Sequence, residues 1–170
     1  MAYPAPMGES TGMQVTIRDY LASDARQLTD IFHDTIHSVG LEHYTAAEAQ
    51  VWAPLPVDYE HWQERLNSLP PMVAEVDGVI AGFITLEPDG HIHWTYTHKD
   101  YQRRGVASTL YRHLEELAQY QGIKRLHVEA SRFAQPFFSA RGFATISEET
   151  LERDGQLLRY MRMEKHLVSS

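Results

Sequence analysis

His91 and His93, which are separated by one residue, are the side chains in this sequence best suited to acid–base chemistry. They open a segment, residues 91–97, that is rich in β-branched and aromatic residues and is therefore predicted to be a β-strand. Residues two apart on a strand share a face, so both imidazoles should lie on the face that carries Thr95 and Thr97. An imidazole titrates near neutral pH and can accept a proton from a substrate.

A basic loop that contains one glycine follows this strand and leads into a helix. The loop and the first helical residues are Gln102, Arg103, Arg104, Gly105, Val106 and Ala107. The first N–H groups of a helix have no intrahelical partner, and the macrodipole favours an anion there. A phosphate site is one interpretation, and an ordinary turn with solvated arginines is the other. A P-loop is disfavoured because no Gly-Lys-Ser/Thr follows.

Composition restricts the classes of function. The 170 residues suit one domain, and the net charge of −8 argues against nucleic acid as a partner. An acidic protein better suits an amine or another cationic substrate. The absence of cysteine excludes a cysteine nucleophile. No apolar run approaches the length of a membrane span and no signal peptide is recognisable, so we expect a cytoplasmic enzyme without a membrane partner.

Periodicity predicts a flexible N-terminal arm at residues 1–12 and a single domain at residues 13–170. The strands are expected at residues 14–19, 72–76, 79–86, 91–97, 125–130, 144–150 and 157–164. One helical pattern follows a cap at Ser23 or Asp24 and is stopped by Gly40, and others occupy residues 46–52, 59–69, 104–121 and 134–140. A helix joins the strands at 91–97 and 125–130, so these two should run parallel. The predicted fold class is α+β, a mostly antiparallel sheet of about seven strands with a central parallel pair and about four helices.

Three features together resemble the GNAT superfamily of acyl-CoA-dependent N-acyltransferases. They are the segment Thr97–Ala107, the segment Ala134–Phe143 with its Phe-Phe pair and Gly-Phe ending, and the order of elements over residues 14–165. More narrowly, three short segments of this sequence resemble a bacterial subgroup of the superfamily whose substrates are largely unassigned. These are Tyr44-Thr45-Ala46-Ala47-Glu48, Trp52-Ala53-Pro54 and Glu129-Ala130-Ser131.

The resemblance implies acetyl-CoA as cosubstrate, no metal, and a small-molecule or peptide amine as acceptor. Dimerisation is common in the superfamily, so a homodimer is one candidate assembly. Residues 102–107 would bind the diphosphate, and strands 91–97 and 125–130 would splay apart to admit the pantetheine arm. The backbone N–H of Thr97 would lie near the thioester carbonyl. Further cofactor contacts are implied for Ala134, Phe137 and Phe138.

Transfer to an amine requires removal of a proton from the ammonium form, and our hypothesis is that His91 and His93 accept it through water. The alternative is that the two histidines only pack against neighbours or face solvent. Their spacing is similar to that of the imidazole pair in arylalkylamine N-acetyltransferases. Tyr44, Trp52 and Glu129 are candidate acceptor-binding residues. The two aromatic residues could equally be core residues, and the carboxylate could simply face solvent or an arginine.

Phe138 stands where many members of the superfamily have a tyrosine that protonates the leaving thiolate. No general acid is therefore assigned, and the candidates are Tyr96, Tyr111, Ser131 or solvent. The missing tyrosine motivates an alternative function, a catalytically inactive acyl-CoA-binding module. A metal site built from His91 and His93 with His98 or His127 is a third interpretation, disfavoured because no Asp or Glu lies at an obvious spacing.

Overall fold

The computed structural model of the protein describes residues 14–42 and 44–168; the predicted arm at residues 1–12 lies outside them. The strands of the first sheet are β1 (Val15–Asp19), β2 (Met72–Val76), β3 (Val79–Leu86) and β4 (Ile92–Thr97), antiparallel in that order. The second sheet has the order β5-β7-β6, with β5 (Arg125–Ser131), β6 (Ala144–Arg153) and β7 (Gln156–His166). The predicted α+β class with seven strands is confirmed.

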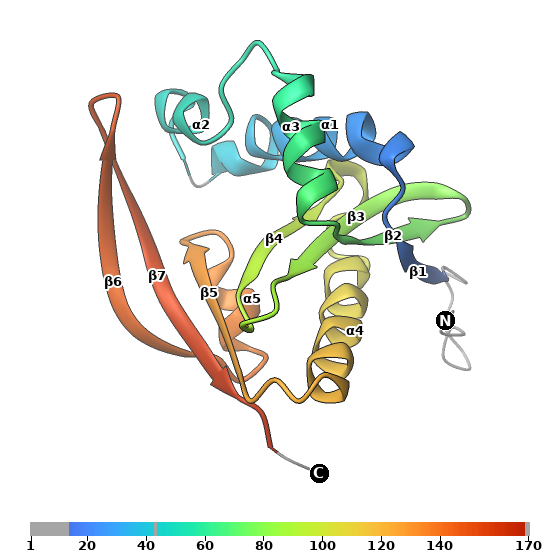
Figure 1. The fold of residues 1–170 in the computed structure, drawn as a ribbon. Coiled ribbons are helices and arrows are strands. Elements are labelled where there is room, and N and C mark those ends of the chain that lie inside the picture. Colours follow the sequence, from blue (N-terminus) through green and yellow to red (C-terminus); the bar gives the residue numbers. More distant parts are fainter. Residues whose placement is uncertain (1–13, 43, 169–170) are drawn as a thin grey trace.

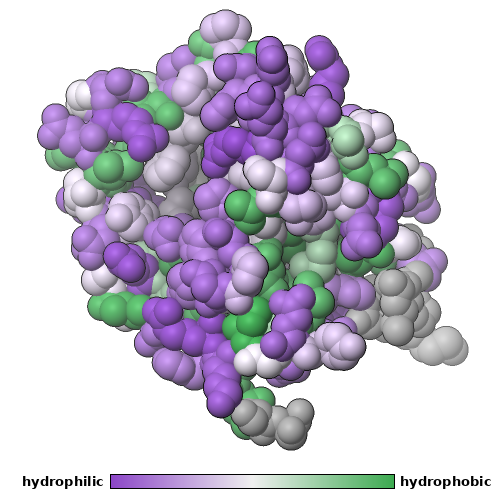
Figure 2. All heavy atoms as spheres, in the orientation of Figure 1, coloured by the Kyte–Doolittle hydropathy of each residue, from purple (hydrophilic) through white to green (hydrophobic). Residues whose placement is uncertain are grey.

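Five α-helices lie in the described part of the chain, one at each helical pattern of the sequence and one more than the figure of about four given for the fold class. They are α1 (Ala25–Ile36), α2 (Ala46–Trp52), α3 (Tyr59–Ser68), α4 (Val106–Tyr120) and α5 (Gln135–Ser139). None of these described helices is long and apolar enough to cross a bilayer. Figure 2 shows hydrophilic residues over most of one face, with hydrophobic residues in small groups between them.

The first sheet is covered on both faces by helices (Figure 1). On one face α4 contributes Leu110 and Leu114, both fully buried against strand residues such as Ile84. On the other face α1 and α3 contribute Phe32 and Trp62 to a second buried cluster. This packing holds β4 rigidly between two hydrophobic layers, so the residues at its free edge have fixed positions.

The parallel strands β4 and β5 touch at one end only and then diverge (Figure 1). The contact is a single parallel bridge between His91 and His127, in which His127 N donates to Gly90 O at 3.0 Å. Gly90 has φ +97°, and a Cβ atom there would lie 2.0 Å from the carbonyl oxygen of Arg125. Glycine thus permits the close approach at which the two sheets begin to separate.

Local sequence signals explain where several elements begin and end. The Thr45 hydroxyl accepts from Glu48 N and the Glu48 carboxylate accepts from Thr45 N, which is the predicted capping box at the start of α2. Asp77 and Gly78 both have positive φ in the β2–β3 turn, as expected for a hairpin. The helix α4 begins at Val106 rather than near Arg104, because residues 102–105 form the preceding loop.

Candidate active site

A cavity of about 460 Å³ lies between the diverging strands β4 and β5 and extends to α1 and α2 on one side and the α4 N-terminus on the other. Thirteen of the predicted site residues line it: Tyr44, Trp52, His93, Thr97, Gln102, Arg103, Gly105, Val106, Ala107, Glu129, Ala134, Phe137 and Phe138. His91 and Arg104 do not line it. Most residues predicted from the sequence as site residues therefore line one cavity. Of the two histidines predicted to be catalytic, His93 lines it and His91 does not.

One end of the cavity is formed by the N-terminus of α4. Gly105 is the N-cap with φ +82°, and a Cβ built there meets nothing within 4 Å, so the backbone is open to an incoming group. The N–H groups of Val106, Ala107 and Ser108 precede the first i→i−4 hydrogen bond, from Thr109 N to Gly105 O. Three donors without intrahelical partners at the positive end of a 15-residue helix suit an anion.

The side chains of the loop divide into structural and accessible groups. Gln102 Nε2 donates to the carbonyl oxygen of Thr97 at 2.7 Å, which fastens the loop to the end of β4. The Arg104 guanidinium lies over the Tyr101 ring at 5.9 Å from its centroid, outside the cavity lining. Of the two arginines, only Arg103 faces the cavity, and it does so from a left-handed backbone conformation with φ +61°.

The free edge of β4 presents backbone groups to the gap. His98 N donates to Ala81 O at 2.7 Å, so these residues form a hydrogen-bonded pair in the antiparallel ladder. Since hydrogen-bonded and non-hydrogen-bonded pairs alternate, the adjacent Gly82–Thr97 pair is non-hydrogen-bonded and the Thr97 N–H is directed away from β3. Thr95, two residues earlier, has the same orientation. The backbone donor predicted at Thr97 therefore faces the space between the sheets.

The candidates for a general acid differ in their access to the cavity. Tyr96 and Ser131 line it, whereas Tyr111 does not and directs its hydroxyl toward Glu115 at 3.4 Å. Burial raises the pKa of Tyr96 above its ordinary value, so its phenol stays protonated at neutral pH. Phe138 is 1% exposed and packs against Phe137 and Phe143, which places a ring without a hydroxyl at that position.

Two aromatic residues, Tyr44 and Trp52, form another part of the cavity lining. The rings of Tyr44 and Trp52 have centroids 6.3 Å apart and interplanar angle 48°. Tyr44 is buried, and Trp52 Nε1 and Thr95 Oγ1 are buried atoms with no hydrogen-bond partner among the described residues. Buried polar atoms are normally paired, but these two have no exposed surface, so a ligand would reach them only after a movement of the cavity wall.

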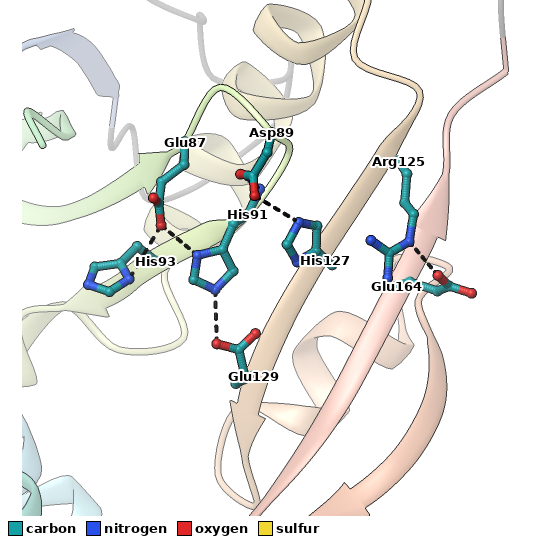
Figure 3. A network of polar contacts seen from close by, with 8 residues as sticks. All are labelled: Glu87, Asp89, His91, His93, Arg125, His127, Glu129 and Glu164. Atoms are coloured by element: carbon teal, nitrogen blue, oxygen red, sulfur yellow. Dashed lines mark hydrogen bonds and ion pairs between the residues drawn. The ribbon is translucent and has the colours of Figure 1, made fainter.

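A chain of histidines and carboxylates lies at the closed end of the gap between the strands (Figure 3). His91 Nδ1 is 2.5 Å from Glu87 Oε1, and His91 Nε2 is 3.0 Å from Glu129 Oε1. The same Glu87 oxygen lies 3.6 Å from His93 Nδ1. On the far side of His91, the ring of His127 stacks at 5.1 Å between centroids.

Sequence reasoning overlooked Glu87. It is the residue that follows β3, and the Glu87 N–H donates to His91 O at 2.8 Å across a turn that contains Asp89 and Gly90. The turn residues Asp89 and Gly90, with the pairing of the two strand ends, are the signal that could have placed Glu87 opposite His91. No Asp or Glu lies at an obvious sequence spacing from the histidines, yet the strand pairing brings both Glu87 and Glu129 to them, so spacing alone was a poor guide to the acidic neighbours. Both carboxylates already accept hydrogen bonds from His91.

The two histidines have opposite charge preferences. Burial alone would lower the pKa of His91, but the hydrogen bond to Glu87 and the charge of Glu129 outweigh it and raise the pKa above its ordinary value. Burial lowers the pKa of His93, and the nearby charges of His91 and Arg65 lower it further. The surroundings of His91 thus favour the imidazolium form, and those of His93 favour the neutral imidazole.

Known proteins match this combination of cavity, helix terminus and splayed strands. The family model for the acetyltransferase (GNAT) domain matches residues 40–167, well over half of the chain. The chain belongs to the GNAT acetyltransferase family. This confirms the predicted family and enzyme class: the protein is a GNAT N-acetyltransferase, and enzymes of this family use acetyl-CoA as cosubstrate.

Individual relatives of this GNAT protein agree with the assignment. The uncharacterized N-acetyltransferase YafP of Escherichia coli is 31% identical over 83% of this chain and 89% of its own length. A GCN5-related N-acetyltransferase from Rhodopseudomonas palustris is 34% identical, with a TM-score of 0.83 over 89% of this chain and 95% of that one. A phosphinothricin acetyltransferase from Sinorhizobium meliloti, solved with acetyl-CoA, shares the fold at 17% identity (TM-score 0.70; 90% and 88% covered).

Proposed function

We propose that this GNAT enzyme transfers an acetyl group from acetyl-CoA to a primary amine by direct attack, with His93 as the residue that takes the proton from the amine. The observation that carries the proposal is the continuity of the cavity. One space is lined by the Gly105 helix terminus, by Thr97, and by His93 and Glu129. An anionic cosubstrate and a cationic amine can therefore meet in one space.

The residues at the helix end of the cavity fit a diphosphate. Three backbone donors at the start of α4 and the Arg103 guanidinium converge there, and Gly105 leaves room for close approach. Acetyl-CoA supplies the activated acetyl group. The Thr97 N–H, directed into the gap by the strand register, is our candidate donor to the carbonyl oxygen of the thioester. Phe137 and Phe138 offer apolar surface to the rest of the cosubstrate.

His93 suits the role of base better than His91. It lines the cavity, and burial keeps its pKa below the ordinary value, so it is neutral where it must accept a proton. His91 lies behind the cavity lining and is already engaged with Glu87 and Glu129. The sequence predicted both histidines as the base; we now assign proton acceptance, directly or through water, to His93 alone. His91 contributes through its positive charge beside His93.

The acceptor is, in this proposal, a small-molecule or peptide amine. Glu129 is the one carboxylate among the residues that line the cavity and can attract an ammonium group. The rings of Tyr44 and Trp52, which line the cavity, offer apolar contact to the body of the amine. We therefore keep these three residues as the acceptor-binding candidates.

Two measurements separate the proposed transferase from an inactive acyl-CoA-binding module. Calorimetric titration with acetyl-CoA should give saturable binding, and Gly105→Glu should abolish it because a carboxylate side chain enters the anion site. Release of free CoA thiol is then followed with a panel of primary amines. Thiol release that depends on an amine supports the transferase. Binding without release for every amine supports the module, and no binding by the wild type overturns both.

A further inference from the structure

Glu87 touches both histidines of the site and no part of the cavity surface. Its Oε1 atom is 2.5 Å from His91 Nδ1 and 3.6 Å from His93 Nδ1. The residue is absent from the cavity lining, so it does not reach the acceptor from this position. Any effect of Glu87 on the reaction therefore passes through the two imidazoles (Figure 3).

The hydrogen-bond partners of His91 define its protonation state. A carboxylate faces each ring nitrogen: Glu87 faces Nδ1, and Glu129 faces Nε2 at 3.0 Å. Ionised carboxylates only accept hydrogen bonds, and only the doubly protonated imidazolium donates from both nitrogens. His91 is therefore held as a cation between two anions. Asp89, which accepts from the backbone N–H of His91, and the stacked ring of His127 complete its surroundings.

The partners of His93 define a neutral ring with a known tautomer. A guanidinium only donates, so Nε2 of His93 accepts from Arg65 Nη2 at 3.2 Å and the single ring proton lies on Nδ1, toward Glu87. Arg65 is held in place by the rings of Trp62 and Trp94, with its Cζ atom 4.8 and 5.2 Å from their centroids. The charged groups that act on His93 are thus Arg65, Glu87, His91 and Glu129.

We propose that Glu87 is a positioning residue that couples the two imidazoles: its carboxylate holds His91 as a cation and keeps the ring proton of His93 on Nδ1, so that the lone pair of His93 is on Nε2. The inference rests on the proposed function of His93. When the acceptor replaces Arg65 at Nε2, that nitrogen takes one proton from the ammonium group and His93 becomes an imidazolium, which the Glu87 carboxylate stabilises. The proton leaves Nε2 to water after the transfer, and His93 returns to its neutral form. His91 keeps both ring protons throughout, and Glu87 and Glu129 remain anions.

The test uses the free enzyme, so it does not depend on knowing the acceptor. Imidazole resonances of histidine-labelled protein are titrated by NMR, with the His91 and His93 signals assigned from the His91→Gln and His93→Gln spectra. In the wild type, His91 should titrate above and His93 below the ordinary histidine value. Glu87→Gln keeps the size of the side chain and removes its charge, so both titrations should move to lower pH. Glu87→Asp, which keeps the charge, should restore most of the His91 shift.

Glu164→Gln is the matched control, because Glu164 is an acidic residue of the neighbouring strand that pairs with Arg125 at 2.5 Å and with His166, and not with His91 or His93 (Figure 3). It should leave both titrations unchanged.

With any amine that the enzyme acetylates, Glu87→Gln should lower kcat about 10- to 100-fold and leave KM for acetyl-CoA unchanged. A His91 titration that is the same in wild type and Glu87→Gln overturns the coupling, even if acetyl transfer itself is confirmed. Failure to find an acceptor leaves the NMR result decisive for Glu87.

Discussion

A base that must work on an ammonium group needs an unprotonated nitrogen at neutral pH, and the neighbours of His93 favour its neutral form, in which the Nε2 lone pair accepts from Arg65 until an acceptor takes its place. Burial and the cations Arg65 and His91 all disfavour its protonated form. The adjacent His91, two residues away, is held as a cation by two carboxylates. Two identical side chains on one strand thus receive different roles from their surroundings, which is how proteins commonly separate acid and base functions.

Replacement of His93 tests this assignment. His93→Gln keeps a polar side chain that can still contact Arg65 but has no titrating nitrogen, so kcat/KM for the amine should fall about 100-fold or more at pH 7. Binding of acetyl-CoA, measured by calorimetry, should not change. His166→Gln, at a 71% exposed side chain near the end of β7, serves as the control. Undiminished kcat/KM in His93→Gln would contradict the role of His93 as a base.

Arg65 gives a prediction for the pH profile. The positive charge of Arg65 lowers the pKa of His93, so removing it in Arg65→Gln should raise that pKa. Because the neutral form is the active base, the acidic limb of kcat/KM should then move to higher pH. Relative to the wild type, kcat/KM should therefore fall more at pH 6 than at pH 8. Arg65→Lys keeps a positive charge and should give a smaller displacement. A limb at the wild-type position in Arg65→Gln would show that Arg65 does not set the titration.

At the scale of elements, the reaction space exists because β4 and β5 meet at one end only. Gly90 makes the contact possible: a Cβ atom there would lie 2.0 Å from Arg125 O, and φ is +97°. Gly90→Ala should therefore force the strands apart at their bridge and destabilise the protein by about 2 kcal/mol or more, a fall in Tm of about 4–8 °C or more. Gly78→Ala is the matched control, since Gly78 has φ +79° but open space around its Cβ position. Equal losses of Tm in the two variants would argue against a steric role for Gly90.

Much of the element order could be predicted from local signals. The capping box at Thr45 fixed the start of α2, and Asp77-Gly78 fixed the β2–β3 turn. The tail strands are longer than predicted, because the antiparallel pairing of β6 with β7 continues as far as Arg153 and Gln156 at the turn. Exposed positions along these strands blur the period-two pattern on which the prediction depended.

The cavity lining was also largely predictable, because it depends on a loop and strand whose residues are close in sequence. The polar network was not predictable in the same way. Glu87 and Glu129 are 42 residues apart in the sequence, and they meet at His91 only through the β3–β4 turn and the β4–β5 bridge. Arg65 reaches His93 from α3 through packing on two tryptophans. Contacts of this kind depend on tertiary packing, which cannot be deduced from the hydrophobic periodicity or the secondary-structure propensities of the sequence.

For the whole molecule, binding of acetyl-CoA should be visible as stability. A ligand that binds only the folded state at 100 times its Kd adds about 2.7 kcal/mol, so Tm should rise about 5–10 °C for a chain of this length. Gly105→Glu should remove the rise, whereas His93→Gln should keep it in full and lose amine-dependent thiol release. This pair of variants separates cosubstrate binding from catalysis within one fold. If His93→Gln also lost the rise in Tm, the histidine strand would belong to the cosubstrate site, and its assignment to proton transfer would be wrong.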